Sequence, residues 1–154
     1  MKKIIALGLM LSFGLVMFAQ QTESYVEVMR SALKTEKKAM VAEVMTFTPE
    51  EAELFWPLYN EFQGKLYVTN TKYVKIVNEF AANFDNMTDE KALDLVTRMS
   101  SYDGELLKLK KTYIKKFSKI IPPTKVLRYY QAENKIDMIV KYEMASSIPF
   151  LETE

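Results

Sequence analysis

The stretch Thr48-Pro49-Glu50-Glu51-Ala52-Glu53-Leu54-Phe55-Trp56-Pro57-Leu58-Tyr59-Asn60 contains the clearest helix start in the chain. The Thr48 hydroxyl can accept a hydrogen bond from the backbone N–H of Glu51, and the Glu51 carboxylate can accept one from the backbone N–H of Thr48. This reciprocal arrangement is a capping box. Pro49 suits the first helical position, where a missing N–H costs nothing. We therefore predict that a helix begins at residue 49.

Apolar residues continue from this start at steps of three and four, as on the buried face of a helix. The pattern predicts a helix over 49–84, in which Pro57 should kink the axis or start a new helical segment. A second apolar series, capped by Thr88, predicts a helix over 89–121. Because the connection between these long helices is short, we expect them to fold back as an antiparallel hairpin.

Two shorter helices are predicted on either side of this hairpin, over about 23–45 and about 125–145. They must cover the apolar surface that the hairpin leaves. Gly64 and Gly104 are the only glycines after the first twenty residues, and both lie inside helix-like stretches. So few glycines is unlike a β protein, because β-turns consume them. The predicted fold is all-α, with four helices in a single domain over 20–154.

Residues 1–19 differ in composition from the rest of the chain. Two lysines precede the uncharged apolar run 4–18, and the small residue Ala19 follows it. This order is typical of a secretory signal peptide, and the run is shorter than the about 20 residues that a membrane span needs. We predict a periplasmic protein whose leader is cleaved near Ala19. Cleavage after Gln20 and a retained anchor stay open as alternatives.

The charge and the residue types exclude several classes of function. The full chain has 21 basic and 20 acidic residues, and loss of the leader removes two lysines, which leaves 19 against 20. A nearly neutral protein is a poor candidate for binding nucleic acid. The chain has no Cys and no His, which excludes disulfides and metal sites built from thiolate or imidazole. We predict no cofactor and no metal.

Paired carboxylates offer little support for catalysis. Glu50 with Glu53, and Glu133 with Asp137, could do acid–base work only if burial forced their pKa values apart. Glu50 and Glu53 fall in the first turn of a helix, where acidic residues are favourable in any case. The chain has no nucleophile elbow, phosphate loop or calcium loop. We therefore predict that it is not an enzyme.

Lysines are concentrated in the helix predicted over 89–121. At helical spacing, Lys108, Lys111, Lys115 and Lys119 form one row, with apolar residues on the opposite side. One interpretation is a solvated face of an amphipathic helix. The other is a positive surface that attracts an acidic partner or anionic headgroups. Both stay open at this point.

Aromatic residues cluster around Pro57. They predict either core packing at a kink or an exposed patch that holds another polypeptide. Because the apolar stripe through Phe55 must face inward, we expect Trp56 and Tyr59 to point to the side, where a partner could reach them. The candidate protein-binding residues are Trp56, Tyr59, Lys65, Lys72, Lys108, Lys111 and Lys115.

The export signal, the long hairpin and the segment Phe47-Thr48-Pro49-Glu50-Glu51 resemble the Spy/CpxP-type LTxxQ family of periplasmic helical proteins. The motif residues are Phe47, Thr48, Pro49 and Glu51. Phe47 and Glu51 stand where the family has Leu and Gln, and both changes are conservative for a capping box. The stretch 48–60 is similar to Bacteroidetes relatives, some of them labelled as sensors linked to extracytoplasmic-function sigma factors. The resemblance covers about 23–145.

The resemblance implies a cradle-shaped homodimer and an ATP-independent chaperone that binds unfolded or partly folded exported proteins. The alternative is a regulatory partner of one membrane-bound sensor domain that reports envelope stress. For that role, the row of lysines is the candidate face. Metal-sensing branches of the family use His-rich sites, which this chain lacks.

Overall fold

The computed structural model describes residues 34–146 and 148–151. The predicted leader over 1–19, its cleavage site and the first part of the predicted helix over 23–45 lie outside the described residues. The chain divides into two compact units, Met1–Val44 and Met45–Glu154. The single domain predicted over 20–154 stays a prediction.

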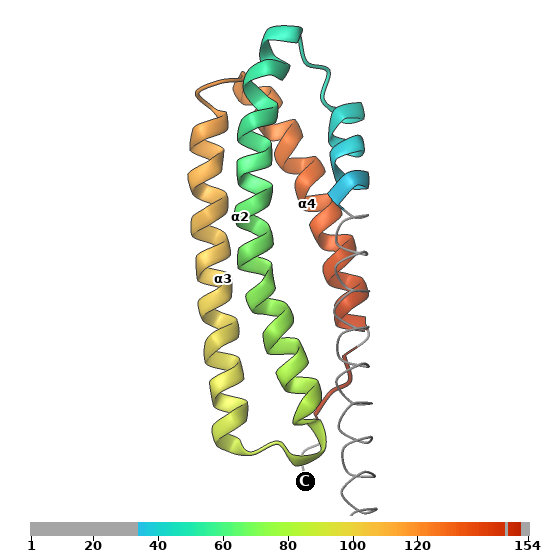
Figure 1. The fold of residues 1–154 in the computed structure, drawn as a ribbon, viewed down its shortest axis with the longest axis vertical. Coiled ribbons are helices and arrows are strands. Elements are labelled where there is room, and N and C mark those ends of the chain that lie inside the picture. Colours follow the sequence, from blue (N-terminus) through green and yellow to red (C-terminus); the bar gives the residue numbers. More distant parts are fainter. Residues whose placement is uncertain (1–33, 147, 152–154) are drawn as a thin grey trace, which may run out of the picture. The chain divides into compact units, whose positions relative to one another are not determined.

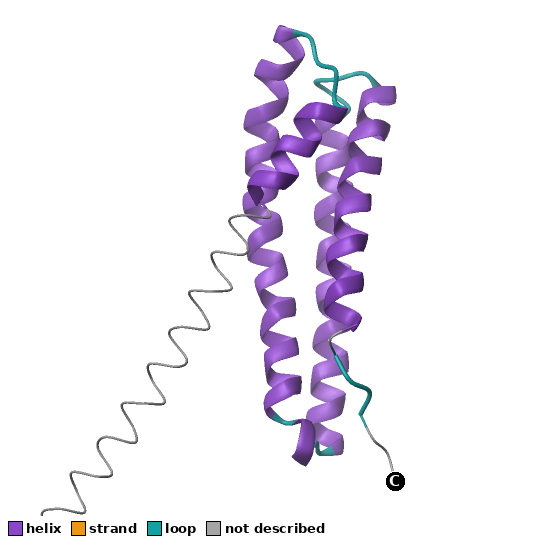
Figure 2. Ribbon diagram, turned by 90° about the vertical axis from the view of Figure 1, so that its right-hand side faces the viewer, coloured by secondary structure: helices purple, strands orange, loops and turns teal. Residues whose placement is uncertain are grey.

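All regular secondary structure in the described residues is helical, which confirms the all-α prediction for that part of the chain (Figure 2). In the first unit, residues 34–44 form a helix. The second unit contains α2 (Pro49–Ala82), a short 3-10 helix η1 (Phe84–Asn86), α3 (Asp89–Phe117) and α4 (Pro123–Ser146).

The helix α2 begins at the predicted capping box. The backbone N–H of Thr48 donates to Glu51 Oε2 at 2.9 Å, and the backbone N–H of Glu51 donates to Thr48 Oγ1 at 3.3 Å. Pro49 occupies the first turn, where no intrahelical acceptor is available for an N–H. The helix runs without interruption past Pro57 to Ala82, so no new helical segment starts at Pro57.

The helices α2 and α3 lie side by side and run in opposite directions (Figure 1). Side-chain pairs between them show the direction. The Tyr113 hydroxyl donates to Glu61 Oε1 at 2.5 Å, and the Tyr102 hydroxyl donates to Asn70 Oδ1 at 3.0 Å. Residue numbers therefore rise on α2 as they fall on α3.

The core of the second unit is aromatic where α2 begins. Phe55 is fully buried, and its ring centroid lies 5.2 Å from that of Phe117 on α3 and 5.1 Å from that of Tyr129 on α4. Phe62 and Tyr113 bring their centroids within 4.7 Å of each other. Each such ring pair stabilises the fold by roughly 0.5–1.5 kcal/mol beyond its buried area. These contacts join three helices.

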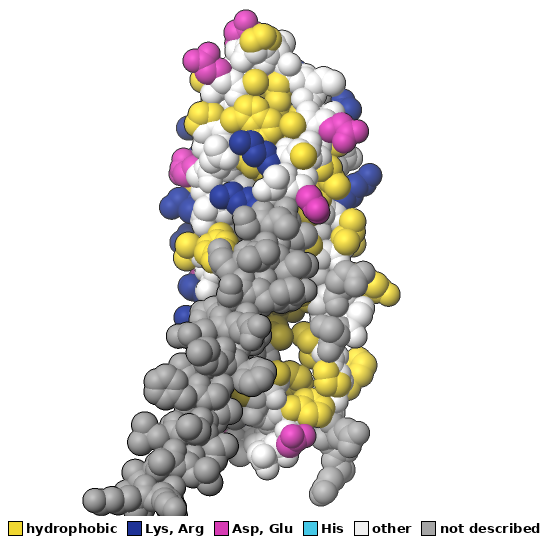
Figure 3. Space-filling model, turned by 45° about the vertical axis from the view of Figure 1, so that its right-hand side comes forward, with side chains coloured by type: hydrophobic (Ala, Val, Ile, Leu, Met, Phe, Trp, Pro, Cys, Tyr) yellow, Lys and Arg dark blue, Asp and Glu magenta, His cyan; other side chains and the backbone are white. Residues whose placement is uncertain are grey.

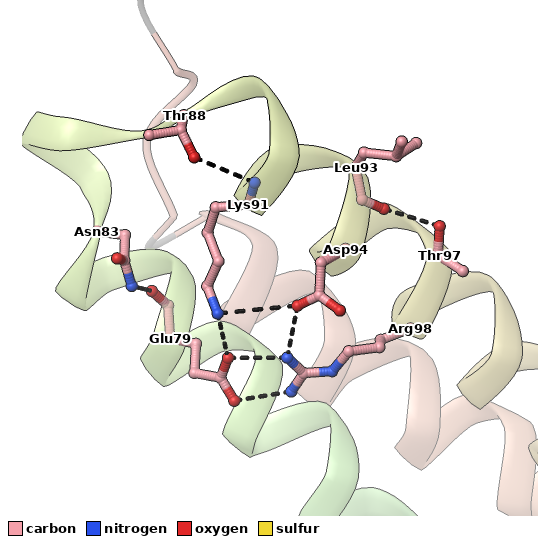
Figure 4. Close-up of polar contacts among 8 residues, drawn as sticks. All are labelled: Glu79, Asn83, Thr88, Lys91, Leu93, Asp94, Thr97 and Arg98. Atoms are coloured by element: carbon pink, nitrogen blue, oxygen red, sulfur yellow. Dashed lines mark hydrogen bonds and ion pairs between the residues drawn. The ribbon is translucent and has the colours of Figure 1, made fainter.

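A charged cluster joins α2 to α3 at the opposite end of the pair (Figure 4). Glu79 accepts hydrogen bonds from both terminal nitrogens of Arg98, at 2.8 and 2.7 Å, and from Lys91 Nζ at 2.8 Å. Arg98 also donates to Asp94 at 2.9 Å. The hydrogen bonds from Arg98 and then Lys91 lower the pKa of Glu79 to about 2. Thr88 caps α3 by accepting from the backbone N–H of Lys91 at 3.2 Å.

Polar pairs attach α4 to the other two helices. Lys110 Nζ on α3 lies 2.6 Å from Asp137 Oδ2 on α4. Gln63 Nε2 on α2 lies 3.3 Å from each carboxylate oxygen of Glu133 on α4. Glu133 is only 2% exposed, and a buried carboxylate requires hydrogen-bond donors. The α4 contact is therefore specified by polar partners as well as by rings.

The connection between α3 and α4 differs from the prediction. The helix α3 ends at Phe117 rather than at residue 121, and the backbone N–H of Ile121 still donates to the Phe117 carbonyl at 3.0 Å in the following turn. The helix α4 begins at Pro123 rather than near residue 125. Proline is favourable in a first turn because it needs no acceptor for an N–H.

Candidate functional site

The motif residues build a structural corner. Lys125, at the start of α4, donates a hydrogen bond to the Glu51 carboxylate, which is the main reason why the pKa of Glu51 is lowered. The backbone hydrogen bond from Thr48 is the second reason. Lys125 Nζ also lies 5.9 Å from the ring centroid of Phe47, whose ring is 4.5 Å from that of Phe55. The motif thus fixes the start of α2 against the start of α4.

Sequence reasoning missed the part that Lys125 takes in this corner. Lys125 and Glu51 are 74 residues apart in the chain. No spacing rule for a single helix reaches that far, because such rules cover only neighbours three or four positions apart. The local signal was the capping box alone.

The expectation that Tyr59 points to the side of α2 is wrong. Tyr59 is 1% exposed, and its ring centroid lies 5.8 Å from that of Phe55 and 6.1 Å from that of Tyr129. The physical reason is that α4 also packs on α2, so the buried stripe is wider than the predicted series. Leu58, one turn after Phe55 and Leu54, is only partly buried. Trp56 is partly exposed, and it alone of the two aromatic candidates reaches the surface.

A polar cluster is enclosed between α2 and α4, but it offers no room for a substrate. The hydroxyl of Tyr59 is buried without a hydrogen-bond partner among the described residues, and the hydroxyl of Tyr129 lies beside Gln63 and Glu133. Burial, and then the charge of Glu133, raises the pKa of both phenols well above the ordinary value. The adjacent cavity, lined in part by Tyr129 and Glu133, measures about 10 Å³, which is room for about one water molecule. The cluster therefore belongs to the core.

The lysines of α3 and of the turn that follows it fall into two sets. Lys91 pairs with Glu79 at 2.8 Å, Lys110 with Asp137, and Lys116 with Glu61 at 2.9 Å. The others are exposed and make no ion pair with any described residue. We call this second set the lysine row: Lys108, Lys111, Lys115 and Lys119. Three of its members, Lys108, Lys111 and Lys115, are predicted candidates, and the structure places them together on one helix face.

The lysine row borders a shallow, open hollow on the outer surface of α3. Its other lining residues are Gly104, Leu107, Thr112 and Lys116. All the lining residues come from the second half of α3 and the turn after it, so the hollow lies along that end of the helix. Leu107 exposes 54% of its surface and places an apolar side chain among the cations.

The two candidate lysines of α2 have different surroundings. Lys72 is exposed and pairs with Glu105 of α3 at 2.6 Å. Lys65 is exposed, and its charge is the smallest of the influences that lower the pKa of Glu61, after the hydrogen bonds from Tyr113 and Lys116 and the charge of Lys116. Neither residue lines the hollow. Of the predicted lysines, the structure brings together only those of α3.

Exposed apolar side chains on α4 and on α3 are further surface features, which sequence reasoning missed. Met138 and Tyr142 lie one turn apart on α4 and are each 71% exposed. Ile139, beside them, is 61% exposed. Leu93 and Val96, one turn apart on α3, are 69% and 66% exposed. Figure 3 shows hydrophobic side chains on the face where α4 lies. The available signal was that α4 carries apolar residues on opposite faces, so one face had to remain uncovered.

In the described part of the chain, no group of His, Cys, Asp or Glu side chains could hold a metal ion. None of the helices described there is long and apolar enough to cross a membrane. No family model, curated protein or solved structure matches the chain.

Proposed function

We propose that the protein is an ATP-independent, chaperone-like protein of the periplasm that binds non-native polypeptides. The observation that carries this proposal is the set of large apolar side chains on outward helix faces. Its clearest members are Met138, Ile139 and Tyr142 on α4, and Leu93 and Val96 on α3. Exposed apolar groups that lie close together mark surfaces that bind other molecules.

The size of these groups fits weak and reversible binding. Full burial of one Leu, Val or Met side chain contributes about 1.5–3 kcal/mol. The loss of translational and rotational freedom on association costs at least about 4 kcal/mol. A few such contacts therefore leave only a modest net affinity, of the kind that lets a bound polypeptide leave and fold. Nucleotide hydrolysis is not needed to release it.

The periplasmic location and the family assignment belong to the same proposal. The location depends on the leader over 1–19, which lies outside the described residues. The resemblance of 47–51 to the Spy/CpxP-type family supports the chaperone role. On the same resemblance we propose a Spy/CpxP-like hairpin and a cradle-shaped dimer.

A second candidate function is regulation through one membrane-bound sensor domain. The lysine row favours it, because unpaired charges on one helix face could recognise a single acidic partner. The two functions differ in their response to mutation. A dedicated interface depends on a few residues, whereas a surface that holds many different polypeptides tolerates most single changes.

The test of the chaperone role is aggregation of a chemically unfolded protein, followed by light scattering after dilution. The mature chain from Gln20 is added at near-stoichiometric ratios without ATP, and we expect it to suppress the scattering. The double variant Met138→Ser/Tyr142→Ser should suppress it less. The matched control is Gln131→Ser/Lys135→Ser, which changes two exposed polar positions of the same helix.

Absence of suppression by a chain that circular dichroism shows to be helical would contradict the chaperone role. It would direct attention to a dedicated sensor partner. Equal losses in the apolar variant and its polar control would mean that the exposed apolar groups of α4 do not hold the polypeptide.

A further inference from the structure

The lysine row is set apart by its lack of partners. Every other cation of α3 has a carboxylate partner: Lys91 and Arg98 with Glu79, Lys110 with Asp137, and Lys116 with Glu61. The lysine row has no such partner among the described residues. Like charges three or four positions apart repel one another, so the row is a concentration of positive charge that the fold leaves unneutralised.

The helix dipole explains only part of the row. Cations are favourable in the last turn of a helix, and this effect fades within that turn. Lys115 lies in the last turn of α3, but Lys108 and Lys111 lie farther back in the helix. Their positions call for a different explanation.

The dimensions of the row suit an extended polypeptide. At 1.5 Å per residue, the spacing of three and four positions places Lys108, Lys111 and Lys115 about 4.5 and 6 Å apart along the axis of α3, and Lys119 follows in the turn after the helix. Alternate side chains of an extended chain are about 6.6 Å apart. The long, flexible lysine stems can accommodate the small difference. The hollow runs beside the row, and Leu107 and Thr112 line it.

We propose that the lysine row docks acidic stretches of extended polypeptide, with carboxylates at alternate positions facing successive lysines. The inference rests on the proposed function and gives it a preference among substrates. Non-native chains that combine apolar residues with a local acidic stretch should bind more tightly and associate faster than neutral ones, because complementary charge steers the encounter.

A membrane surface fits this face less well. A helix that lies in a bilayer interface needs a broad apolar face beside its basic residues. The large apolar residues Leu106, Tyr113 and Phe117 are buried in the core. Leu107 is the exposed large apolar side chain of this stretch, and one such residue makes a narrow anchor.

The test uses fluorescence anisotropy with three labelled peptides that alternate Ser with Glu, Gln or Lys. The mature chain should bind the Glu peptide, bind the Gln peptide much more weakly and leave the Lys peptide free. The variant Lys111→Glu/Lys115→Glu should weaken binding of the Glu peptide roughly tenfold or more, since each exposed ion pair accounts for up to about fivefold and both are reversed. High salt should weaken it as well.

The matched control is Lys75→Glu/Lys135→Glu, which makes the same charge change at exposed positions of α2 and α4. Equal weakening in both double variants would overturn the proposal, because net charge and not the row would then govern binding. Binding to anionic vesicles without binding to the Glu peptide would also overturn it.

The two proposals can fail separately in these experiments. Suppression of aggregation without preference for the Glu peptide would contradict the docking of acidic stretches and would still support the chaperone role. Row-dependent binding of the Glu peptide without suppression would support the docking and contradict the chaperone role. The row would then serve a dedicated acidic partner.

Discussion

Removal of one phenolic oxygen from each of two buried tyrosines tests the hydrogen bonding in the core. Tyr59 and Tyr113 are 1% and 2% exposed. The Tyr59 hydroxyl has no hydrogen-bond partner among the described residues, whereas the Tyr113 hydroxyl donates to Glu61 at 2.5 Å. Replacement by Phe removes the same oxygen at both positions. We expect opposite changes in the free energy of unfolding.

The magnitudes follow from the two environments. A buried hydroxyl without a partner costs about 1–3 kcal/mol, so Tyr59→Phe should raise the free energy of unfolding by about 1 kcal/mol. A hydrogen bond to a carboxylate contributes about 1.5–3 kcal/mol, but the Glu61 side chain is 46% exposed and solvent screens it. Tyr113→Phe should therefore lower the free energy of unfolding by about 1 kcal/mol. For the unit Met45–Glu154, 1 kcal/mol corresponds to about 4 °C in Tm.

The assay is equilibrium unfolding in guanidinium chloride, followed by far-ultraviolet circular dichroism and supported by thermal melts. The two variants should differ by about 8 °C in Tm. Tyr142→Phe is the matched control, since Tyr142 is 71% exposed and its change should stay within about 0.5 kcal/mol. A loss of stability in Tyr59→Phe as large as that in Tyr113→Phe would refute the reasoning, because it would mean that the Tyr59 hydroxyl is paired in solution.

Three further predictions concern stability. Gly64→Ala should raise the free energy of unfolding by about 0.8–1 kcal/mol in denaturant titrations, because an added Cβ meets nothing within 4 Å; a loss would show that the position is crowded. Thr48→Ala should lower it by about 0.5–2 kcal/mol, and Thr48→Ser should restore most of the loss if the cap is responsible. The lowered pKa of Glu79 means that its pairing with Arg98 stabilises the fold above pH 4.5 and is lost as the pH falls toward about 2. The difference in Tm between the wild type and Glu79→Gln should therefore shrink over that range, and a constant difference would contradict the assigned pairing.

The sequence predicted those parts of the fold that depend on local signals. The capping box at Thr48 and the helical class of the described residues follow from neighbouring residues alone. Contacts across the chain could not be predicted in this way. Gln63 and Glu133 are 70 residues apart, and nothing in either helix indicates that they meet.

On the candidate surface, too, local spacing could be predicted and contacts between distant residues could not. Spacing alone placed Lys108, Lys111 and Lys115 in one row. It could not show that Lys110, next to Lys111, is neutralised by Asp137, because that partner comes from α4. Tyr59 was misplaced for a related reason, since its burial depends on how α4 packs over α2.

The most direct test of the central claim is calorimetric titration of the chain from Gln20 with one polypeptide in two states, native and permanently unfolded, in buffer without nucleotide. We predict binding to the unfolded state, weakened by Met138→Ser/Tyr142→Ser, and no binding to the native state. Binding to neither state, or equal binding to both, would contradict the claim that the protein recognises non-native polypeptides.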